Sequence, residues 1–187
     1  MKTIALEEHV GNPKIAAAVR ATGKVLARKT PEQVVEKLKD AGKGRLADMD
    51  AAGIDLQVLS GTGVGLDKLD RETGAILARE SNDALAEIVR SRPDRFAAFA
   101  LLAMQDPEEA AAELDRCVVT LGFKGALISG TINDRFLDDP IFAPVLAQAE
   151  RLDVPLYLHP APPPEPVCKA YFSGLPEEIA GSLATSA

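Results

Sequence analysis

Apolar residues are arranged along the chain in two ways, as short continuous runs and as longer stretches in which they recur at helical spacing. A short apolar run bounded by polar or turn residues is typical of a buried strand. Such runs predict strands at residues 3–10, 55–60, 96–102, 125–129 and 155–159. Helical patterns separate most of the runs, and this alternation predicts an α/β fold with a parallel sheet and right-handed crossovers.

Capping signals mark where the helices are expected to begin. In Asp106-Pro107 and Asp139-Pro140, an aspartate suited to the N-cap precedes a proline, which is favoured at the first helical position. Capping and spacing together predict helices over residues 30–53, 67–90, 106–122 and 139–152. Residues 11–29, which contain two glycines and a proline, predict instead an irregular loop with at most one helical turn at residues 15–19.

Two potential metal ligands end the first predicted strand, and a third ends the last. Side chains alternate between the faces of a strand, so Glu7 and His9 are expected to project together. The same face is predicted to carry Thr3 and Ala5, and the opposite face Ile4, Leu6 and Glu8. His9 and His159 are the only histidines in the chain. A solvated strand exit is the alternative for Glu7 and His9 alone, but scattered surface histidines would not be expected to close two strands.

Two architectures fit the predicted strands. An open, flavodoxin-like sheet of five parallel strands would be complete at this length, whereas a (β/α)8 TIM barrel needs about 250 residues. In a closed barrel, strands one and five lie across the same mouth, so Glu7, His9 and His159 could converge on one ion. A carboxylate with two imidazoles suits zinc, manganese or ferrous iron. We therefore favour an incomplete barrel, with about five of eight units present.

Composition narrows the class of protein. The chain has 187 residues, of which 47% are hydrophobic, which is typical of one domain, here residues 1–187, with a sizeable core. A net charge of -7 argues against a nucleic-acid partner. No apolar run is long enough for a membrane span and no signal-peptide pattern is present, so we expect no membrane partner and a cytoplasmic location. The glycine-rich residues 61–65 match no nucleotide-binding motif.

The sequence resembles the amidohydrolase superfamily, in the branch that includes non-oxidative decarboxylases of aromatic acids. The resemblance is carried by Ala5-Leu6-Glu7-Glu8-His9, Arg92-Pro93-Asp94-Arg95-Phe96, Gly122-Phe123-Lys124-Gly125-Ala126-Leu127 and Leu152-Asp153-Val154-Pro155-Leu156-Tyr157-Leu158-His159-Pro160. These segments occur in the family's order along the chain. The pattern Glu7-x-His9, in place of the His-x-His of many relatives, is similar to the decarboxylase branch.

The resemblance implies a divalent metal ion, zinc or manganese, held by Glu7 and His9 after strand one and by His159 after strand five. It also implies an aspartate after strand eight and a histidine after strand six, neither of which can be assigned here. The catalytic residues therefore stay unassigned, and the chain looks like the amino-terminal portion of the fold. A homo-oligomer is expected, and the exposed strand edges of an incomplete barrel are expected to drive association and to leave the isolated chain nearly inactive.

The implied reaction is decarboxylation of a hydroxylated aromatic or related unsaturated carboxylic acid, with that small molecule as the binding partner. The alternatives are a metal-dependent hydrolase of a lactone, ester or amide, a non-haem iron oxygenase, and an inactive fragment. Ser60 and Ser129, which end strands two and four, are the candidate substrate contacts, although serines at strand ends often bond only to local backbone. Residues 133–135 predict a turn, and the proline-rich residues 160–166 predict a stiff loop.

Overall fold

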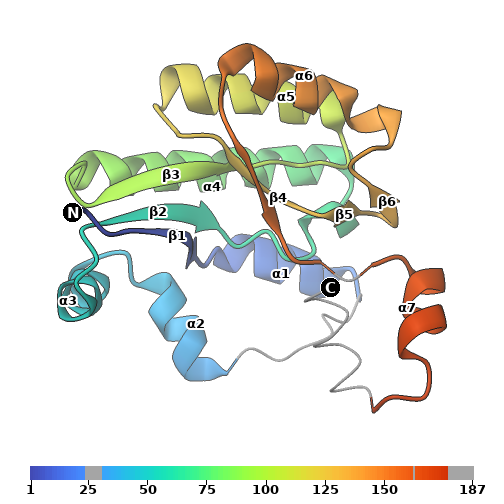
Figure 1. Cartoon of the computed structure of the whole chain (residues 1–187), viewed down its shortest axis with the longest axis horizontal. Coiled ribbons are helices and arrows are strands. Elements are labelled where there is room, and N and C mark those ends of the chain that lie inside the picture. The colour runs from blue at the N-terminus through green and yellow to red at the C-terminus, as the bar shows by residue number, and fades with distance from the viewer. Residues whose placement is uncertain (24–30, 162, 177–187) are drawn as a thin grey trace.

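The computed structural model describes residues 1–23, 31–161 and 163–176. Within these residues, a parallel sheet winds through the molecule in the order β1-β2-β3-β4-β7. Its strands are β1 (Ile4–Val10), β2 (Leu56–Gly61), β3 (Phe96–Leu101), β4 (Ala126–Ser129) and β7 (Leu156–His159). All the predicted strands are thereby confirmed, with ends that differ by at most one residue. The sheet curls strongly, so that β4 and β7 cross the direction of β1 and β2 (Figure 1).

The strand order decides between the two predicted architectures. An open flavodoxin-like sheet has the order 2-1-3-4-5, because its winding reverses after the first crossover. Here each strand pairs with the one before it, without reversal. Right-handed crossovers in one direction place the helices on one face of the sheet, as in a (β/α)8 barrel. The prediction of an incomplete barrel is confirmed, and the open sheet is excluded.

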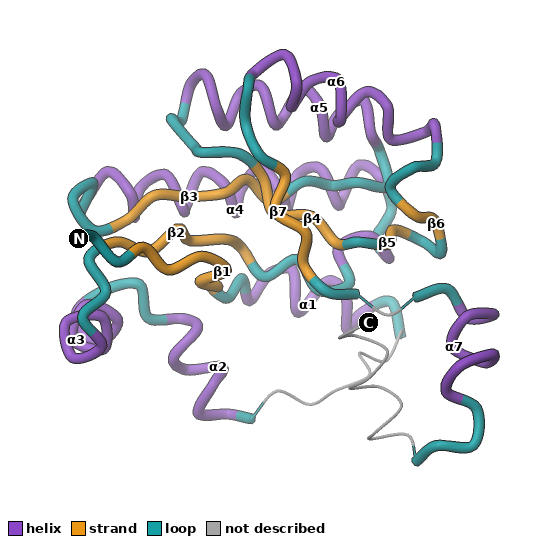
Figure 2. Tube along the Cα trace, in the orientation of Figure 1, coloured by secondary structure: helices purple, strands orange, loops and turns teal. Residues whose placement is uncertain are grey.

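Along the chain, most helices connect one strand of the sheet to the next, and in space they lie beside the sheet (Figure 2). They are α1 (Pro13–Ala21), α2 (Glu32–Lys39), α3 (Lys43–Ala52), α4 (Arg71–Ser91), α5 (Pro107–Asp115), α6 (Ala143–Leu152) and α7 (Glu165–Phe172). A π-helical turn, Arg116–Thr120, extends α5, and 3₁₀ turns at Leu66–Lys68 and Pro140–Phe142 precede α4 and α6. The short strands β5 (Thr131–Ile132) and β6 (Arg135–Phe136) form a hairpin, whose turn at Asn133 and Asp134 was predicted.

The predicted aspartate caps are present. The Asp106 side chain accepts a hydrogen bond from the Glu109 amide at 3.5 Å, and Asp139 accepts one from the Ile141 amide at 3.0 Å. Asp70, which sequence reasoning did not select, caps α4 by accepting from the Thr73 amide at 2.9 Å. These contacts satisfy amides that have no partner within the first helical turn, so helix starts could be predicted locally.

The prediction of one helix over residues 30–53 is wrong. The chain breaks into α2 and α3 at Asp40, whose backbone is extended and whose Oδ1 accepts a hydrogen bond from the Gly42 amide at 2.7 Å. Gly44 leaves room beside this turn, because a Cβ there would lie 2.1 Å from Asp40 Oδ2 and the carboxylate would have to move. An aspartate that bonds to nearby backbone in this way competes with helix continuation. Thr30, where this helix was predicted to begin, lies outside the described residues.

The irregular loop predicted for residues 11–29 is also wrong over its first half. Residues 13–21 form α1, because the Asn12 side chain accepts hydrogen bonds from the amides of Lys14 and Ile15 at 2.9 and 3.3 Å and Pro13 occupies the first turn. Ile15 and Val19 are buried against the 3₁₀ turn and α4. Of the predicted proline-rich loop, residues 165 and 166 belong instead to α7.

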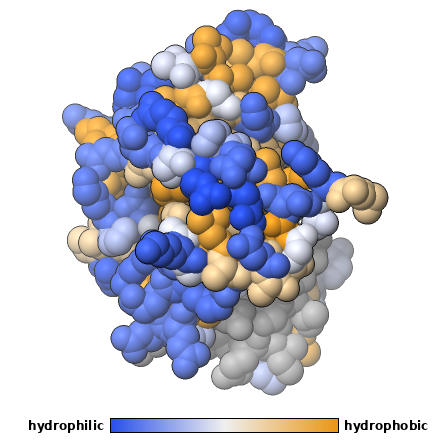
Figure 3. Space-filling view, turned by 90° about the vertical axis from the view of Figure 1, so that its left-hand side faces the viewer, coloured by the Kyte–Doolittle hydropathy of each residue, from blue (hydrophilic) through white to orange (hydrophobic). Residues whose placement is uncertain are grey.

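Two apolar clusters lie on opposite faces of the sheet. The larger cluster joins α3, α4, α5 and α6 to the sheet and includes Met49, Leu85, Leu114 and Val145. The smaller cluster consists of Val58, Phe99 and Leu127 and contains no helical residue, so it marks the concave, inner face of the curl. Figure 3 looks onto the amino-terminal ends of β1 and β2, where hydrophilic residues are interspersed with apolar ones.

Candidate metal centre

A bulge shapes the end of β1. Ala5 pairs with Gln57 and Glu8 pairs with Leu59. Between these pairs β1 has two residues, Leu6 and Glu7, whereas β2 has only Val58. The extra residue is accommodated at Glu7, whose φ of 65° is in the left-handed region. For a residue with a side chain this conformation costs on the order of 1–2 kcal/mol. Such strain is frequent at functional sites, where the surrounding structure enforces it.

The bulge corrects the predicted alternation of side chains. Because Gln57 and Leu59 share a face of β2, their partners Ala5 and Glu8 share a face of β1. Ala5 was predicted on the face of His9, and that prediction is wrong. Glu7 and His9 nevertheless lie together, because the bulge leaves both near the inner face.

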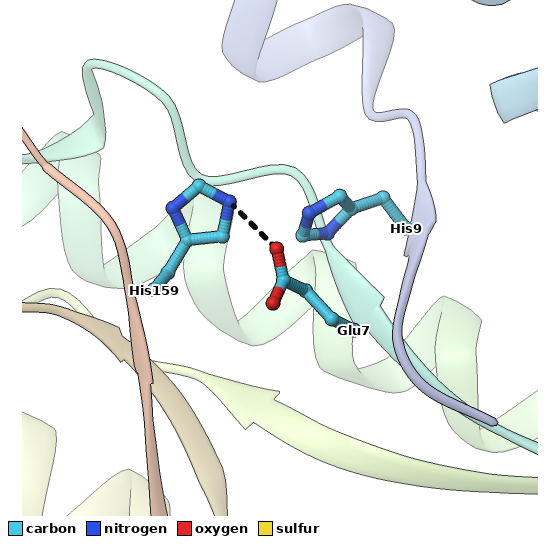
Figure 4. A group of neighbouring side chains, drawn as sticks. All are labelled: Glu7, His9 and His159. Carbon is cyan, nitrogen blue, oxygen red and sulfur yellow. Dashed lines mark ion pairs between the residues drawn. The ribbon is translucent and has the colours of Figure 1, made fainter. Parts of the chain in front are cut away.

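The curl of the sheet brings the two outermost strands, β1 and β7, toward each other. Glu7, His9 and His159 each offer one ligand atom, and these atoms all lie within 4.8 Å of one another. His159 Nε2 is 3.5 Å from Glu7 Oε1, and the two imidazole rings have centroids 5.2 Å apart (Figure 4). The carboxyl ends of barrel strands are where barrel enzymes place their chemistry, and this is where the cluster lies.

The backbone of the next residue, Pro160, fixes the tautomer of the His159 ring. Its Nδ1 is 2.7 Å from the carbonyl oxygen of Pro160. A carbonyl oxygen can only accept a hydrogen bond, so Nδ1 carries a proton, and in the neutral ring Nε2 has the free lone pair. That lone pair is on the nitrogen nearest Glu7, which is the arrangement required of a metal-binding imidazole.

His9 is positioned by a buried hydroxyl. Its Nδ1 is 3.0 Å from Ser60 Oγ, and Ser60 is only 1% exposed. Burial lowers the pKa of His9, and the nearby His159 lowers it further, against an opposing effect of Glu7. His9 therefore favours the neutral imidazole, the form that coordinates a metal ion.

The two carboxylate oxygens of Glu7 have different surroundings. Oε2 accepts a hydrogen bond from the Tyr157 hydroxyl at 2.9 Å, which raises the pKa of Tyr157. Oε1 is the oxygen nearest His159. One anchored carboxylate, one imidazole of defined tautomer and a second imidazole held by Ser60 fit a divalent cation. The chemistry of these side chains is the basis for treating the cluster as a candidate metal centre.

The two predicted substrate contacts occupy different positions. Ser60 contacts His9 and is shielded from solvent. Ser129 pairs with His159 in the sheet register and is partly exposed at the end of β4. Tyr157, which sequence reasoning missed, precedes His159 by two residues, so the period of a strand could have placed both side chains on one face.

A parallel sheet wound in barrel order, with a carboxylate and two imidazoles at its strand ends, defines the class of metal-dependent (β/α)-barrel enzymes. The sequence model of the amidohydrolase family matches residues 16–183, and the chain belongs to that family. The resemblance stated from the sequence is confirmed.

Several relatives share both sequence and fold with the chain. It is 38% identical to a gamma-resorcylate decarboxylase of Rhizobium radiobacter over 167 residues, which cover 86% of this chain and 50% of that protein. A 5-carboxyvanillate decarboxylase of Novosphingobium aromaticivorans, solved with manganese and 4-hydroxy-3-methoxy-5-nitrobenzoic acid, superposes with a TM-score of 0.83 at 33% identity, covering 98% of this chain and 58% of that one.

A dihydroxybenzoic acid decarboxylase of a Polaromonas species, solved with manganese and 2-nitroresorcinol, superposes with a TM-score of 0.77 at 35% identity, covering 93% of this chain and 54% of that one. The chain thus spans about half the length of the relatives it matches.

Proposed function

We propose that the chain forms the ligand-bearing part of a metal-dependent, non-oxidative decarboxylase that acts on a hydroxylated aromatic or related unsaturated carboxylic acid. The observation that carries the proposal is the convergence of Glu7, His9 and His159 within 4.8 Å. The named relatives supply the reaction class, because they are decarboxylases of such acids.

Manganese is the first choice of metal and zinc the second. Two of the relatives were solved with manganese, and a carboxylate beside imidazoles suits that ion. When bound, a divalent cation would supply positive charge to orient the substrate carboxylate and a neighbouring hydroxyl. Glu7 Oε1, His9 Nε2 and His159 Nε2 are the atoms that we propose to hold it.

The remaining contacts of the site fix these ligands. Tyr157 restrains Glu7, the Pro160 carbonyl fixes the tautomer of His159, and Ser60 holds the His9 ring. We propose that Ser60 acts on substrate only through His9, because it is buried, whereas the partly exposed Ser129 contacts substrate directly. No proton donor for the ring carbon is assigned among the described residues.

The test is a carbon dioxide assay on the decarboxylase of which the chain is proposed to form the ligand-bearing part, with the 187-residue chain assayed beside it. From that decarboxylase we expect release from hydroxylated benzoates that requires manganese, proceeds without oxygen and is lost in Glu7→Gln. From the 187-residue chain alone we expect almost no release, as an incomplete barrel predicts. Hydrolysis of lactones, esters or amides without carbon dioxide release would replace the proposal by the hydrolase alternative. Manganese binding by that decarboxylase without either turnover would contradict the proposed activity and support the inactive-fragment alternative.

The location, oligomeric state and domain organisation of the protein stay predictions. Among the described residues, no helix combines the length and the apolar character needed to cross a bilayer. A cytoplasmic location, a homo-oligomer and a single domain over residues 1–187 are proposals that sedimentation and fractionation would test.

A further inference from the structure

The strained backbone at Glu7 requires something to enforce it. β1 is the first strand of the sheet and pairs only with β2, so one of its sides lacks a neighbouring strand within the described residues. The contacts on the inner face, from Tyr157 and Ser60, reach only the side chains of the ligands. β2 holds one side of this backbone through its pairing with β1. A group that holds the other side must come from another element.

Arg45, at the start of α3, provides such a group. Its side chain is only 10% exposed. Nη2 donates to the backbone carbonyl of His9 at 2.6 Å, and Nε donates to the carbonyl of Asp40 at 2.8 Å. Nη1 donates to Gln57 Oε1 at 3.2 Å and lies 3.9 Å from Glu8 Oε2. One planar guanidinium therefore joins the bulged strand, its neighbour β2 and the turn between α2 and α3.

The turn between α2 and α3 places the Asp40 carbonyl where Arg45 Nε can donate to it. Asp40 turns the chain by accepting from the Gly42 amide, and the missing side chain of Gly44 makes room for the Asp40 carboxylate. The turn also holds the strand end directly, because the Gly11 amide donates to the carbonyl of Leu38 at 2.8 Å. The helix break that sequence reasoning missed thus presents Arg45 to the metal-ligand strand.

We propose that Arg45 is a positioning residue, which holds the bulged end of β1 so that Glu7 and His9 can coordinate one ion together with His159. The inference rests on the proposed metal site. Arginine suits the role because its fixed fork of donors reaches several carbonyl and carboxylate oxygens at once, which a lysine ammonium on a flexible chain does not reproduce.

Arg95 offers a matched control. It is also largely buried, at 18% exposed, and it donates to the backbone carbonyls of Ile54 and Asp55, both at 3.0 Å. These carbonyls precede β2, at the end of the sheet opposite the cluster. Arg45→Met and Arg95→Met therefore each remove a buried guanidinium from backbone oxygens, but only the first removes it from the ligand strand.

The experiment compares both variants and Arg45→Lys with the 187-residue wild-type chain by two readouts. The first is the Kd for Mn²⁺, with unfolding by urea measured in parallel. The second, in the metal-free protein, is the ring nitrogen signals of the two ¹⁵N-labelled histidines. We expect Arg45→Met to weaken Mn²⁺ binding about 10- to 100-fold, as for other groups that orient metal ligands, and to shift the His9 signals. Arg45→Lys should recover part of the affinity, and Arg95→Met should lower stability alone.

An Arg45→Met chain with wild-type Mn²⁺ affinity and unchanged His9 signals would overturn the inference, as would equal loss of affinity in Arg95→Met at equal loss of stability. If Arg45→Met does not fold, the same comparison is decided on Arg45→Lys. A wild-type chain that binds no Mn²⁺ would refute the proposed metal site, whereas the metal-free histidine signals would still decide whether Arg45 positions His9.

Discussion

Tyr157→Phe tests whether a residue of β7 positions the metal ligand Glu7 of β1. The substitution removes one oxygen, and with it the 2.9 Å hydrogen bond to Glu7 Oε2, while the ring can keep its stacking on Phe99, whose centroid is 5.9 Å away. A hydrogen bond to a charged group contributes about 1.5–3 kcal/mol. Because both partners are partly exposed, we expect the lower end of that range.

Loss of this hydrogen bond should lower the affinity for the metal ion and leave the free energy of unfolding nearly unchanged. A change of 1.4 kcal/mol is about tenfold in Kd, so Tyr157→Phe should raise the Kd for Mn²⁺ about tenfold in an isothermal titration. Tyr171→Phe is the control, since Tyr171 is 78% exposed and lies in α7, outside the strands that carry the ligands. An unchanged Kd in Tyr157→Phe would refute the reasoning that Tyr157 restrains the carboxylate of Glu7.

Four further predictions follow from other contacts. His159→Ala should cut manganese content sharply by elemental analysis, and full occupancy would exclude His159 as a ligand. Asn82→Ala should cost about 3 kcal/mol in urea unfolding, because buried Asn82 bonds the Leu101 amide and carbonyl and Glu113. Burial alone would raise the pKa of Glu113, but Arg116 and Asn82 hold it below its usual value. This stabilisation should be present above the ordinary glutamate pKa and lost as pH falls through the lowered one, and Glu113→Gln should flatten that acid limb. Sedimentation should detect association of the chain through the exposed Ile4, Leu6 and Leu158 of the outermost strands; a monomer at all concentrations would contradict this.

Local chemistry made much of the fold predictable. Continuous apolar runs set the strands, and aspartate-proline pairs set helix starts, because both signals act over a few residues. Glu7, His9 and His159 could be selected as candidate ligands for the same reason, since each closes an apolar run. The α1 helix could have been predicted from Asn12 and Pro13, but the basic and glycine residues that follow concealed it.

Only the tertiary structure decided how the ligands meet. The bulge at Glu7 changes which side chains share a face of β1. No residue within β1 predicts the bulge, because neither a glycine nor a proline marks its position. Arg45 reaches His9 across 36 positions and Tyr157 reaches Glu7 across 150, so these contacts exist only once the strands wind in barrel order. The ligand types and the strands that carry them could be read from the order of residues alone. Their convergence depends on the curl of the sheet, because side chains at strand ends come within bonding distance only when the sheet brings those ends together.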